Sequence, residues 1–340
     1  RSVVQHFILD NSFYSIDYPI KYASCLIIYE SLYNYYLLNE TMKIKLGNEY
    51  DKYFKINDKN NIFANIEKYN GNEYKNYYFP KVLCLISTQN FFKEQEEILK
   101  QIYQYSMDKN LKKIPIEKKI LTILCNIPMP PNGFLEIEYN ISENYNKILI
   151  KRNRMNKIPS IKEEIYLIFS KFVIDTILEI FKYLIFETKI LIFGSQTNEL
   201  SNFIYGLISL IFPFNYSFQI SSAIPKKAYK IIESISPYIL GINREFNISF
   251  FKENKIDITD LNVLIIDLDK NCAKFLGDKS VPNIPSLLLK PLREGLKKIE
   301  FKENLWDEEK YINNFKIVRQ LFFNFFVNIM TNYELYIKTD

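Results

Sequence analysis

The chain has 340 residues, 48% of them hydrophobic, and 44 basic against 39 acidic side chains leave a net charge of +5. This composition excludes disordered and fibrous proteins, and so mild a charge argues against a nucleic-acid partner. The length predicts two domains, each large enough for its own core. Because His6 is the single histidine of the chain, the sequence argues against a mechanism that uses a histidine base, a histidine-containing triad or a histidine metal site.

Residues 1–150 predict an α+β lobe in which helices pack on an antiparallel sheet. Runs rich in β-branched and aromatic residues predict strands at 1–9, 21–32, 77–87, 133–141 and 146–150. Apolar residues at helical spacing predict helices at 90–106 and 116–125, and a polar, lysine-rich loop is expected over 40–76. The basic, proline-terminated segment 151–160 is the expected boundary of this lobe.

Residues 200–225 carry no charge, which raises the question of a membrane span. A span needs about 20 apolar residues, but Pro213 ends the helical pattern that starts at Asn198. Thr197 is the expected N-cap of this helix. Beyond the proline, apolar and polar residues alternate over 214–221, the pattern of a half-buried strand. The segment therefore predicts a buried helix followed by a strand in a soluble domain.

The sequence on either side predicts an α/β domain with a mostly parallel sheet and closing helices. Continuous apolar runs predict buried strands at 189–193, 237–242 and 261–269. Helical spacing of apolar residues predicts helices at 173–186, 225–235, 285–299 and 311–338.

The motifs of this domain point to no catalytic residue, no metal ligand and no cofactor. Gly194 follows a strand, but it is a single glycine where dinucleotide- and phosphate-binding loops need more. Asp267 and Asp269 could hold Mg²⁺ or act as a base, although capping of a turn is the simpler interpretation. These features favour a regulator or a binding platform over an enzyme.

The cysteines stand far apart in the sequence and form no CxxC pair. We expect buried free thiols rather than disulfides. The four positions are Cys25, Cys84, Cys125 and Cys272.

Six motifs occur in the order seen in DENN-domain proteins, and together they resemble that family. The motifs are FPKVLCLIS, IPMPPNG, LIFETKILIFGS, FPFNYSFQISSAIP, PYILGI and VLIIDLD. The later segment RQLFFNFFVNIMTNYELYI is similar to the first helix of the family's downstream segment. The resemblance implies a longin-like N-terminal lobe (1–150), a basic linker (151–160), a central DENN α/β lobe (161–300) and the start of the downstream helical segment (301–340).

The resemblance also implies a function. DENN-domain proteins act as guanine-nucleotide exchange factors in vesicle-mediated transport, promoting GDP release from a Rab-family small GTPase by binding its switch regions. Exchange needs no acid, base, nucleophile or cofactor from the exchange factor, so the chain would be a regulator. The implied location is cytoplasmic, at endomembrane or vesicle surfaces, with peripheral membrane association through the GTPase or flanking regions. The sequence leaves the oligomeric state open.

The protein–protein contact is expected at strand ends and loops of the central lobe. The candidate partner-binding residues are Ser195, Gln196, Asn215, Tyr216, Asp267 and Asp269.

Two alternatives stay open. A DENN scaffold could recruit a small GTPase or a coat partner without exchange, and two departures from the family pattern allow this: Tyr216 stands in place of Trp and Thr188 in place of a basic residue. A GTPase-activating relative of the folliculin type would need an exposed arginine. The candidates for that arginine are Arg152, Arg154, Arg244 and Arg293.

Overall fold

The computed structural model describes residues 2–9, 21–31, 65–69, 72–76, 78–107, 114–131, 133, 135–152, 163–244, 262–277, 281–299 and 308–331. The chain divides into two compact units. Unit 1 contains residues 1–5 and 25–85, and unit 2 contains residues 6–24 and 86–340. Most of the basic segment 151–160, the predicted domain boundary, lies outside the described residues.

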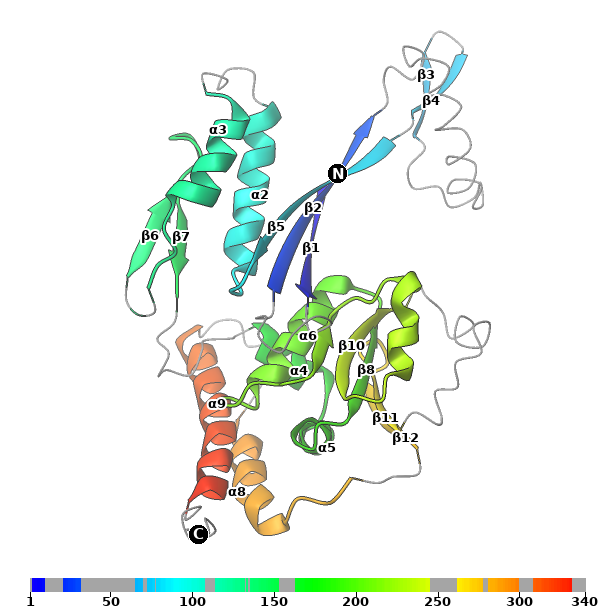
Figure 1. Ribbon diagram of the computed structural model, residues 1–340, viewed down its shortest axis with the longest axis vertical. Helices are drawn as coiled ribbons and strands as arrows, with labels where there is room; N and C mark the ends of the chain where they lie inside the picture. The colour runs from blue at the N-terminus through cyan, green and yellow to red at the C-terminus, as the bar shows by residue number, and fades with distance from the viewer. Residues whose placement is uncertain are drawn as a thin grey trace. The chain divides into compact units, whose positions relative to one another are not determined.

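Eight of the described strands form one mixed sheet, in the hydrogen-bonded order β12-β11-β8-β10-β9-β1-β2-β5 (Figure 1). Unit 1 contains the first part of β1 (Ser2–Leu9), most of β2 (Lys21–Ser31) and most of β5 (Tyr78–Ser87). A separate pair of antiparallel strands, β3 (Asn65–Tyr69) and β4 (Asn72–Asn76), lies inside the segment predicted to be a loop. The loop prediction was therefore wrong for these residues.

The centre of unit 2 is a parallel set of four strands, as the apolar runs predicted. In sheet order these are β11 (Val263–Asp267), β8 (Lys189–Gly194), β10 (Tyr238–Asn243) and β9 (Gln219–Ser221). On one side, β12 (Cys272–Leu276) pairs antiparallel with β11. On the other side, Leu9 of β1 pairs antiparallel with Ser221. The mixed α/β fold class is thereby confirmed.

The side chains of β8 show why this sheet is buried on both faces. Ile190 and Ile192 point into a core formed with the helices α4 (Glu163–Lys171), α5 (Ile174–Ile185), α6 (Thr197–Ser209), α8 (Ser286–Lys297) and α9 (Glu308–Met330). Leu191 points to the opposite face, where the 3₁₀ helix η3 (Lys226–Glu233) contributes Tyr229 and Ile232. Successive strand residues face opposite sides of a sheet, so the side chains of each apolar strand contribute to two cores, one on each face.

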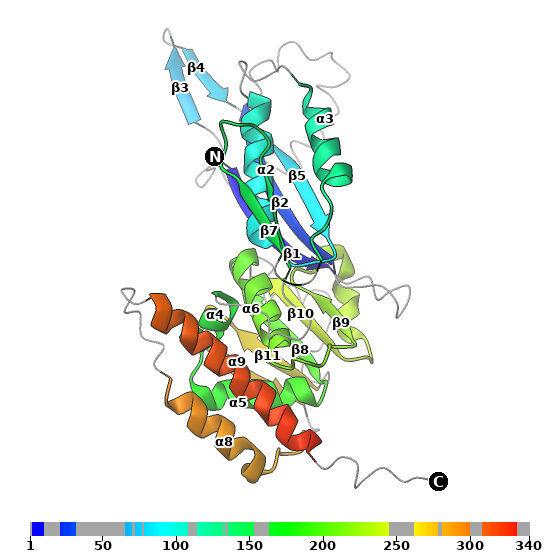
Figure 2. The ribbon, with the colours of Figure 1, turned by 90° about the vertical axis from the view of Figure 1, so that its left-hand side faces the viewer.

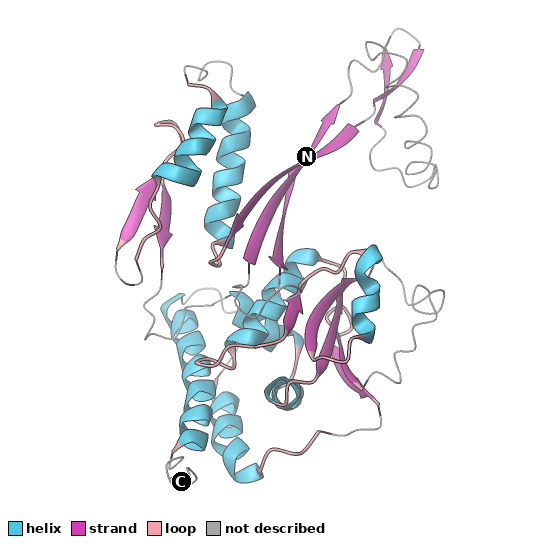
Figure 3. Cartoon of the chain, viewed as in Figure 1, coloured by secondary structure: helices cyan, strands magenta, loops and turns pink. Residues whose placement is uncertain are grey.

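The closing helices pack on the first of these cores. Phe181 of α5 is fully buried and meets Phe322, Phe325 and Phe326 of α9 edge-on, with ring centroids 4.7 to 5.9 Å apart. Figures 2 and 3 show α8 lying beside α9. These aromatic contacts make α9 part of the central fold.

The rest of unit 2 carries two further helices and a separate hairpin. Helix α2 (Phe92–Met107) is amphipathic, and α3 (Ile116–Leu121) continues into a π-helical turn over Thr122–Asn126. Strands β6 (Glu136–Tyr139) and β7 (Ile148–Lys151) pair antiparallel with each other. Every strand and helix predicted here exists within the described residues, with bounds that differ by a few residues.

The uncharged stretch folds as a helix and a strand. Helix α6 ends at Ser209, before Pro213, and β9 covers Gln219–Ser221, which is shorter than the predicted strand. The cap prediction was wrong: Thr197 is the first helical residue, and the N-cap is Gln196, without a side-chain cap. In the described part of the chain, none of the helices combines the length and apolar character that crossing a membrane requires.

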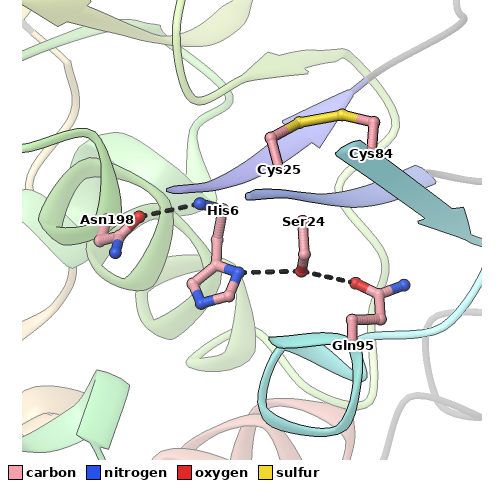
Figure 4. The surroundings of a disulfide bond; sticks show 6 residues. All are labelled: His6, Ser24, Cys25, Cys84, Gln95 and Asn198. Atoms are coloured by element: carbon pink, nitrogen blue, oxygen red, sulfur yellow. Dashed lines mark hydrogen bonds between the residues drawn. A yellow bond between two sulfur atoms is a disulfide. The ribbon is translucent and has the colours of Figure 1, made fainter. Parts of the chain in front are cut away.

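The cysteine prediction was also wrong. Cys25 and Cys84 of unit 1 form a disulfide between the neighbouring strands β2 and β5 (Figure 4). Cys125 and Cys272 are free, but both are exposed rather than buried. Spacing along the sequence could not show the first pair, because the pairing of β2 with β5 brings together residues that are 59 positions apart.

Candidate functional site

The carboxyl ends of β8, β10 and β11 lie along one edge of the parallel sheet, and the polar residues that follow them meet there. We call this the carboxyl edge: Ser195, Gln196, Arg244, Asp267 and Asp269. Two backbone hydrogen bonds join the three strand ends. The Arg244 amide donates to the Gly194 carbonyl at 2.9 Å, and the Leu268 amide donates to the Phe193 carbonyl at 2.8 Å. In open parallel sheets this edge is where binding sites form.

Ser195 is attached to Asp269 by two hydrogen bonds. Its backbone amide donates to Oδ1 at 3.2 Å, and its hydroxyl donates to Oδ2 at 2.9 Å. The turn that follows β8 is therefore fixed to the turn that follows β11.

Arg244 holds both aspartates of the edge. One guanidinium nitrogen, Nη2, pairs with Asp267, and the other, Nη1, lies 3.1 Å from Asp269 Oδ2. Asp267 also accepts hydrogen bonds from the amides of Asp269 and Lys270, at 3.1 and 3.0 Å. The exposed fractions of the three side chains are 35% for Arg244, 13% for Asp267 and 23% for Asp269. Asp267 thus caps the turn that follows β11, as the simpler interpretation of the sequence predicted, whereas Asp269 accepts from Ser195 instead.

Gln196 is the exposed residue of this edge that precedes α6. Its carbonyl accepts the first helical hydrogen bond, from the Leu200 amide at 3.1 Å. The first turn of α6 is anchored to β1, since Asn198 Oδ1 accepts the His6 amide at 2.8 Å (Figure 4). The Ser201 hydroxyl in turn donates to the His6 carbonyl at 2.5 Å. The first turn of α6, beside Gln196, is therefore fixed to β1 at His6.

Asn215 and Tyr216 lie at the opposite, amino edge of the sheet, because they precede β9. Asn215 is exposed, whereas Tyr216 is buried, with 7% of its surface accessible. Burial, followed by the charge of Glu187, raises the pKa of Tyr216. Its buried hydroxyl has no hydrogen-bond partner within the described residues. The structure thus brings together four of the six predicted residues and separates these two from them.

The predicted arginines differ in their surroundings. Arg244 is engaged by two carboxylates, as above, and Arg293 of α8 pairs with Asp175 of α5 at 3.2 Å. Arg152 has a buried Nε with no hydrogen-bond partner among the described residues. Arg154 lies outside the described residues.

The carboxyl edge offers no metal site. Across the described ranges, no three histidine, cysteine or acidic side chains come close enough to hold a metal ion. Asp267 and Asp269 already carry Arg244 and Ser195 as partners. Apart from Gln196, the side chains of this edge are held by one another, so the carboxyl edge is an ordered polar surface.

The fold is an α/β domain with an ordered polar surface at the carboxyl ends of its parallel strands. Comparison with known families identifies the domain: the model of the DENN (AEX-3) domain matches residues 78–271. The chain belongs to the DENN-domain family, as the six motifs predicted.

The segments that align with curated relatives cover about half of this chain. The DENN domain-containing protein C297.05 of Schizosaccharomyces pombe is 24% identical over 169 residues, which are 49% of this chain. The MAP kinase-activating death domain protein of Caenorhabditis elegans is 26% identical over 189 residues, 54% of this chain. The Elicitor of plant defense protein 1 of Verticillium dahliae is 23% identical over 158 residues, 46% of this chain. The matched segments cover 17%, 13% and 13% of these relatives' own lengths.

Proposed function

We propose that this chain is a guanine-nucleotide exchange factor that promotes GDP release from a Rab-family small GTPase. The observation that carries the proposal is the DENN-domain match over residues 78–271, in a family whose resemblance implies this activity. The N-terminal α+β part would be the longin-like lobe of such a protein. The proposed place of action is the cytoplasmic face of endomembranes or vesicles, reached through the GTPase or through flanking regions.

Nucleotide exchange requires a binding surface of fixed geometry, and the carboxyl edge is an ordered polar surface of that kind. An exchange factor must bind the nucleotide-free GTPase more tightly than the GDP-bound form, because only differential affinity shifts the equilibrium. A surface that bound both forms equally would leave the rate of GDP release unchanged in this scheme. Such a surface requires fixed geometry, so that it complements one arrangement of the switch segments.

We place this surface at the carboxyl edge. Gln196 and Ser195 are exposed there, and the hydrogen bonds between Ser195 and Asp269 fix the turn that carries them. The amide hydrogens in the first turn of α6 lie next to Gln196 and point out of the helix start, where a helix favours acceptor groups. In this proposal the side chain of Gln196 and the Ser195 turn contact the GTPase, and Asp267 and Asp269 hold that turn.

A panel of Rab proteins loaded with fluorescent GDP tests the proposal. The chain should accelerate release of the labelled nucleotide from at least one Rab when excess unlabelled GTP is present, and heat-inactivated chain should not. If no Rab of the source organism releases GDP faster, the exchange function is refuted. If a Rab binds tightly but its GDP release stays at the intrinsic rate, the scaffold alternative replaces it.

The same assay addresses the GTPase-activating alternative. Stabilising a transferring phosphoryl group requires an arginine free to leave its own partners. The Arg244 guanidinium is paired with two carboxylates and Arg293 with one. Because the proposal assigns exchange to the chain, phosphate release from GTP-loaded Rab should stay at the intrinsic rate when the chain is added. An acceleration that is lost in Arg152→Ala or Arg154→Ala would favour the GTPase-activating alternative instead.

A further inference from the structure

We propose that Arg244 is the positioning residue of the exchange surface, acting on the Ser195–Gln196 turn without touching the GTPase. This inference rests on the proposed exchange function. The residue follows β10 directly, between β8 and β9 in the sheet order. It is joined to the other strand ends through both its backbone and its side chain.

The backbone contact reaches β8 and the side-chain contacts reach β11. The Arg244 amide donates to the Gly194 carbonyl at 2.9 Å, one residue before Ser195. The guanidinium then pairs with Asp267, the last residue of β11, and with Asp269 two residues later. The carboxyl ends of three parallel strands, β8, β10 and β11, are thus joined through Arg244.

The link from Arg244 to the turn passes through Asp269. Oxygen Oδ2 of Asp269 lies 3.1 Å from Arg244 Nη1 and accepts the Ser195 hydroxyl at 2.9 Å. The same carboxylate receives the Ser195 amide on Oδ1 at 3.2 Å. The rotamer of Asp269 therefore decides where Ser195 lies, and Arg244 fixes that rotamer.

An arginine suits this task better than a lysine. Its planar guanidinium carries donors that diverge in fixed directions, so it can engage two carboxylates at once. Without that positive charge, Asp267 and Asp269 would repel each other across the short turn that they share. The turn beyond β11, which passes through Asn271 in the left-handed region, would then lose part of its support.

Loss of Arg244 should appear as weaker apparent binding of the GTPase. If the Ser195–Gln196 turn keeps its binding-competent arrangement only about a tenth of the time, the apparent affinity falls about tenfold. Because Arg244 itself makes no contact with the GTPase in this scheme, the rate of GDP release at saturation should be retained. The effect therefore falls on KM rather than on kcat.

The test compares the wild-type chain with Arg244→Gln and Arg244→Lys, using the Rab that wild type activates best. We expect Arg244→Gln to raise KM about tenfold with kcat within about twofold, and Arg244→Lys to recover about half of that loss on a logarithmic scale. Amide hydrogen exchange of peptides covering 193–200 should speed up in Arg244→Gln, because the Ser195 amide loses its fixed acceptor.

Arg293→Gln is the matched control. It removes an arginine–carboxylate pair of similar distance, to Asp175, at the α5–α8 contact rather than at the carboxyl edge. Its KM and the protection of residues 193–200 should equal those of wild type.

The outcomes separate the two proposals. If wild type accelerates GDP release but Arg244→Gln has wild-type KM and wild-type amide protection, the positioning role is refuted and the exchange function stands. If Arg244→Gln lowers kcat while KM stays constant, Arg244 acts on the bound GTPase itself and the inference is equally refuted. If Arg244→Gln does not fold, Arg244→Lys provides the test. A wild-type KM in Arg244→Lys would show that a guanidinium engaging two carboxylates is not required, and would refute the inference. If wild type releases no GDP from any Rab, the exchange function fails, and this inference fails with it.

Discussion

The imidazole of His6 stacks on the ring of Phe92, with ring centroids 4.6 Å apart and an interplanar angle of 24°. The same imidazole lies 2.9 Å from the Ser24 hydroxyl through Nδ1 and 3.3 Å from Glu96 Oε2 through Nε2. Ser24 in turn donates to Gln95 at 2.7 Å (Figure 4). The histidine thus has a structural role between β1, β2 and α2.

Stability should fall in mild acid because of His6. Burial lowers the pKa of this imidazole below 6.5, and the neighbouring Glu96 only partly opposes that effect. Below about pH 6.5 the unfolded chain binds a proton that the folded chain does not, so the free energy of unfolding decreases as the pH falls towards the folded-state pKa. The slope from this one group is at most about 1.4 kcal/mol per pH unit.

Urea denaturation at about pH 7.5 and about pH 5.5, on wild type and His6→Gln, isolates this contribution. Glu96 and Lys100, the charged groups that act on the imidazole, are present in both proteins. The advantage of wild type over His6→Gln should shrink at the lower pH. Parallel pH profiles, or a wild-type advantage that grows in acid, would contradict the assignment.

The two edges of the sheet give a matched pair of variants for the contact surface. Gln196→Ala at the carboxyl edge should lower kcat/KM for GDP release by about tenfold, as expected for loss of a polar contact with a desolvated partner. Asn215→Ala at the amino edge truncates an amide side chain that is also exposed, and it should change kcat/KM by less than about twofold. The reverse result would move the contact surface to the amino edge.

Phe181 should be among the most costly core residues to truncate. Phe181→Ala would remove a fully buried ring that meets three phenylalanines of α9, and it should lower the free energy of unfolding by about 3–5 kcal/mol. Ile317→Ala, on the same helix α9 but 40% exposed, should cost less than about 0.5 kcal/mol. Chemical denaturation of the two variants measures both, and similar losses would show that α9 does not pack as described.

The disulfide predicts how many cysteines a thiol-specific reagent can label. Without reductant, a thiol-specific reagent should label two cysteines of the folded chain, Cys125 and Cys272, which are exposed and free. After reduction and unfolding it should label all four. Peptide mapping should recover Cys25 and Cys84 as one cross-linked pair before reduction. Four labels on the native, unreduced chain would exclude the disulfide.

Much of the central lobe could be predicted because its patterns are strong. The apolar run 189–193 is buried on both sheet faces, and Pro213 separates a helix from a strand, as its missing amide requires. Helix α4 and strand β12 were not predicted. Strand β12 is short, with each residue exposed or half-buried, so tertiary pairing with β11 rather than its own pattern determines it.

The site was predictable where strand direction decides it. Ser195 and Asp269 follow parallel strands and Asp267 ends one, so they had to share an edge. Tyr216 precedes β9 and therefore had to lie at the other edge, so the prediction that it joins Ser195 was wrong. Arg244 was considered only as a candidate for phosphate chemistry, although its place directly after a third parallel strand was a usable signal. Its partners depend on the strand order, and a single sequence does not specify that order.

The proposed exchange function requires the carboxyl edge to bind one state of a small GTPase in preference to another. The most direct test measures the dissociation constant of the chain for the same Rab in its GDP-bound and nucleotide-free forms. We expect the affinity for the nucleotide-free form to be higher by about tenfold or more. Equal dissociation constants for the two forms, however tight, would contradict it, because equal binding cannot drive GDP release.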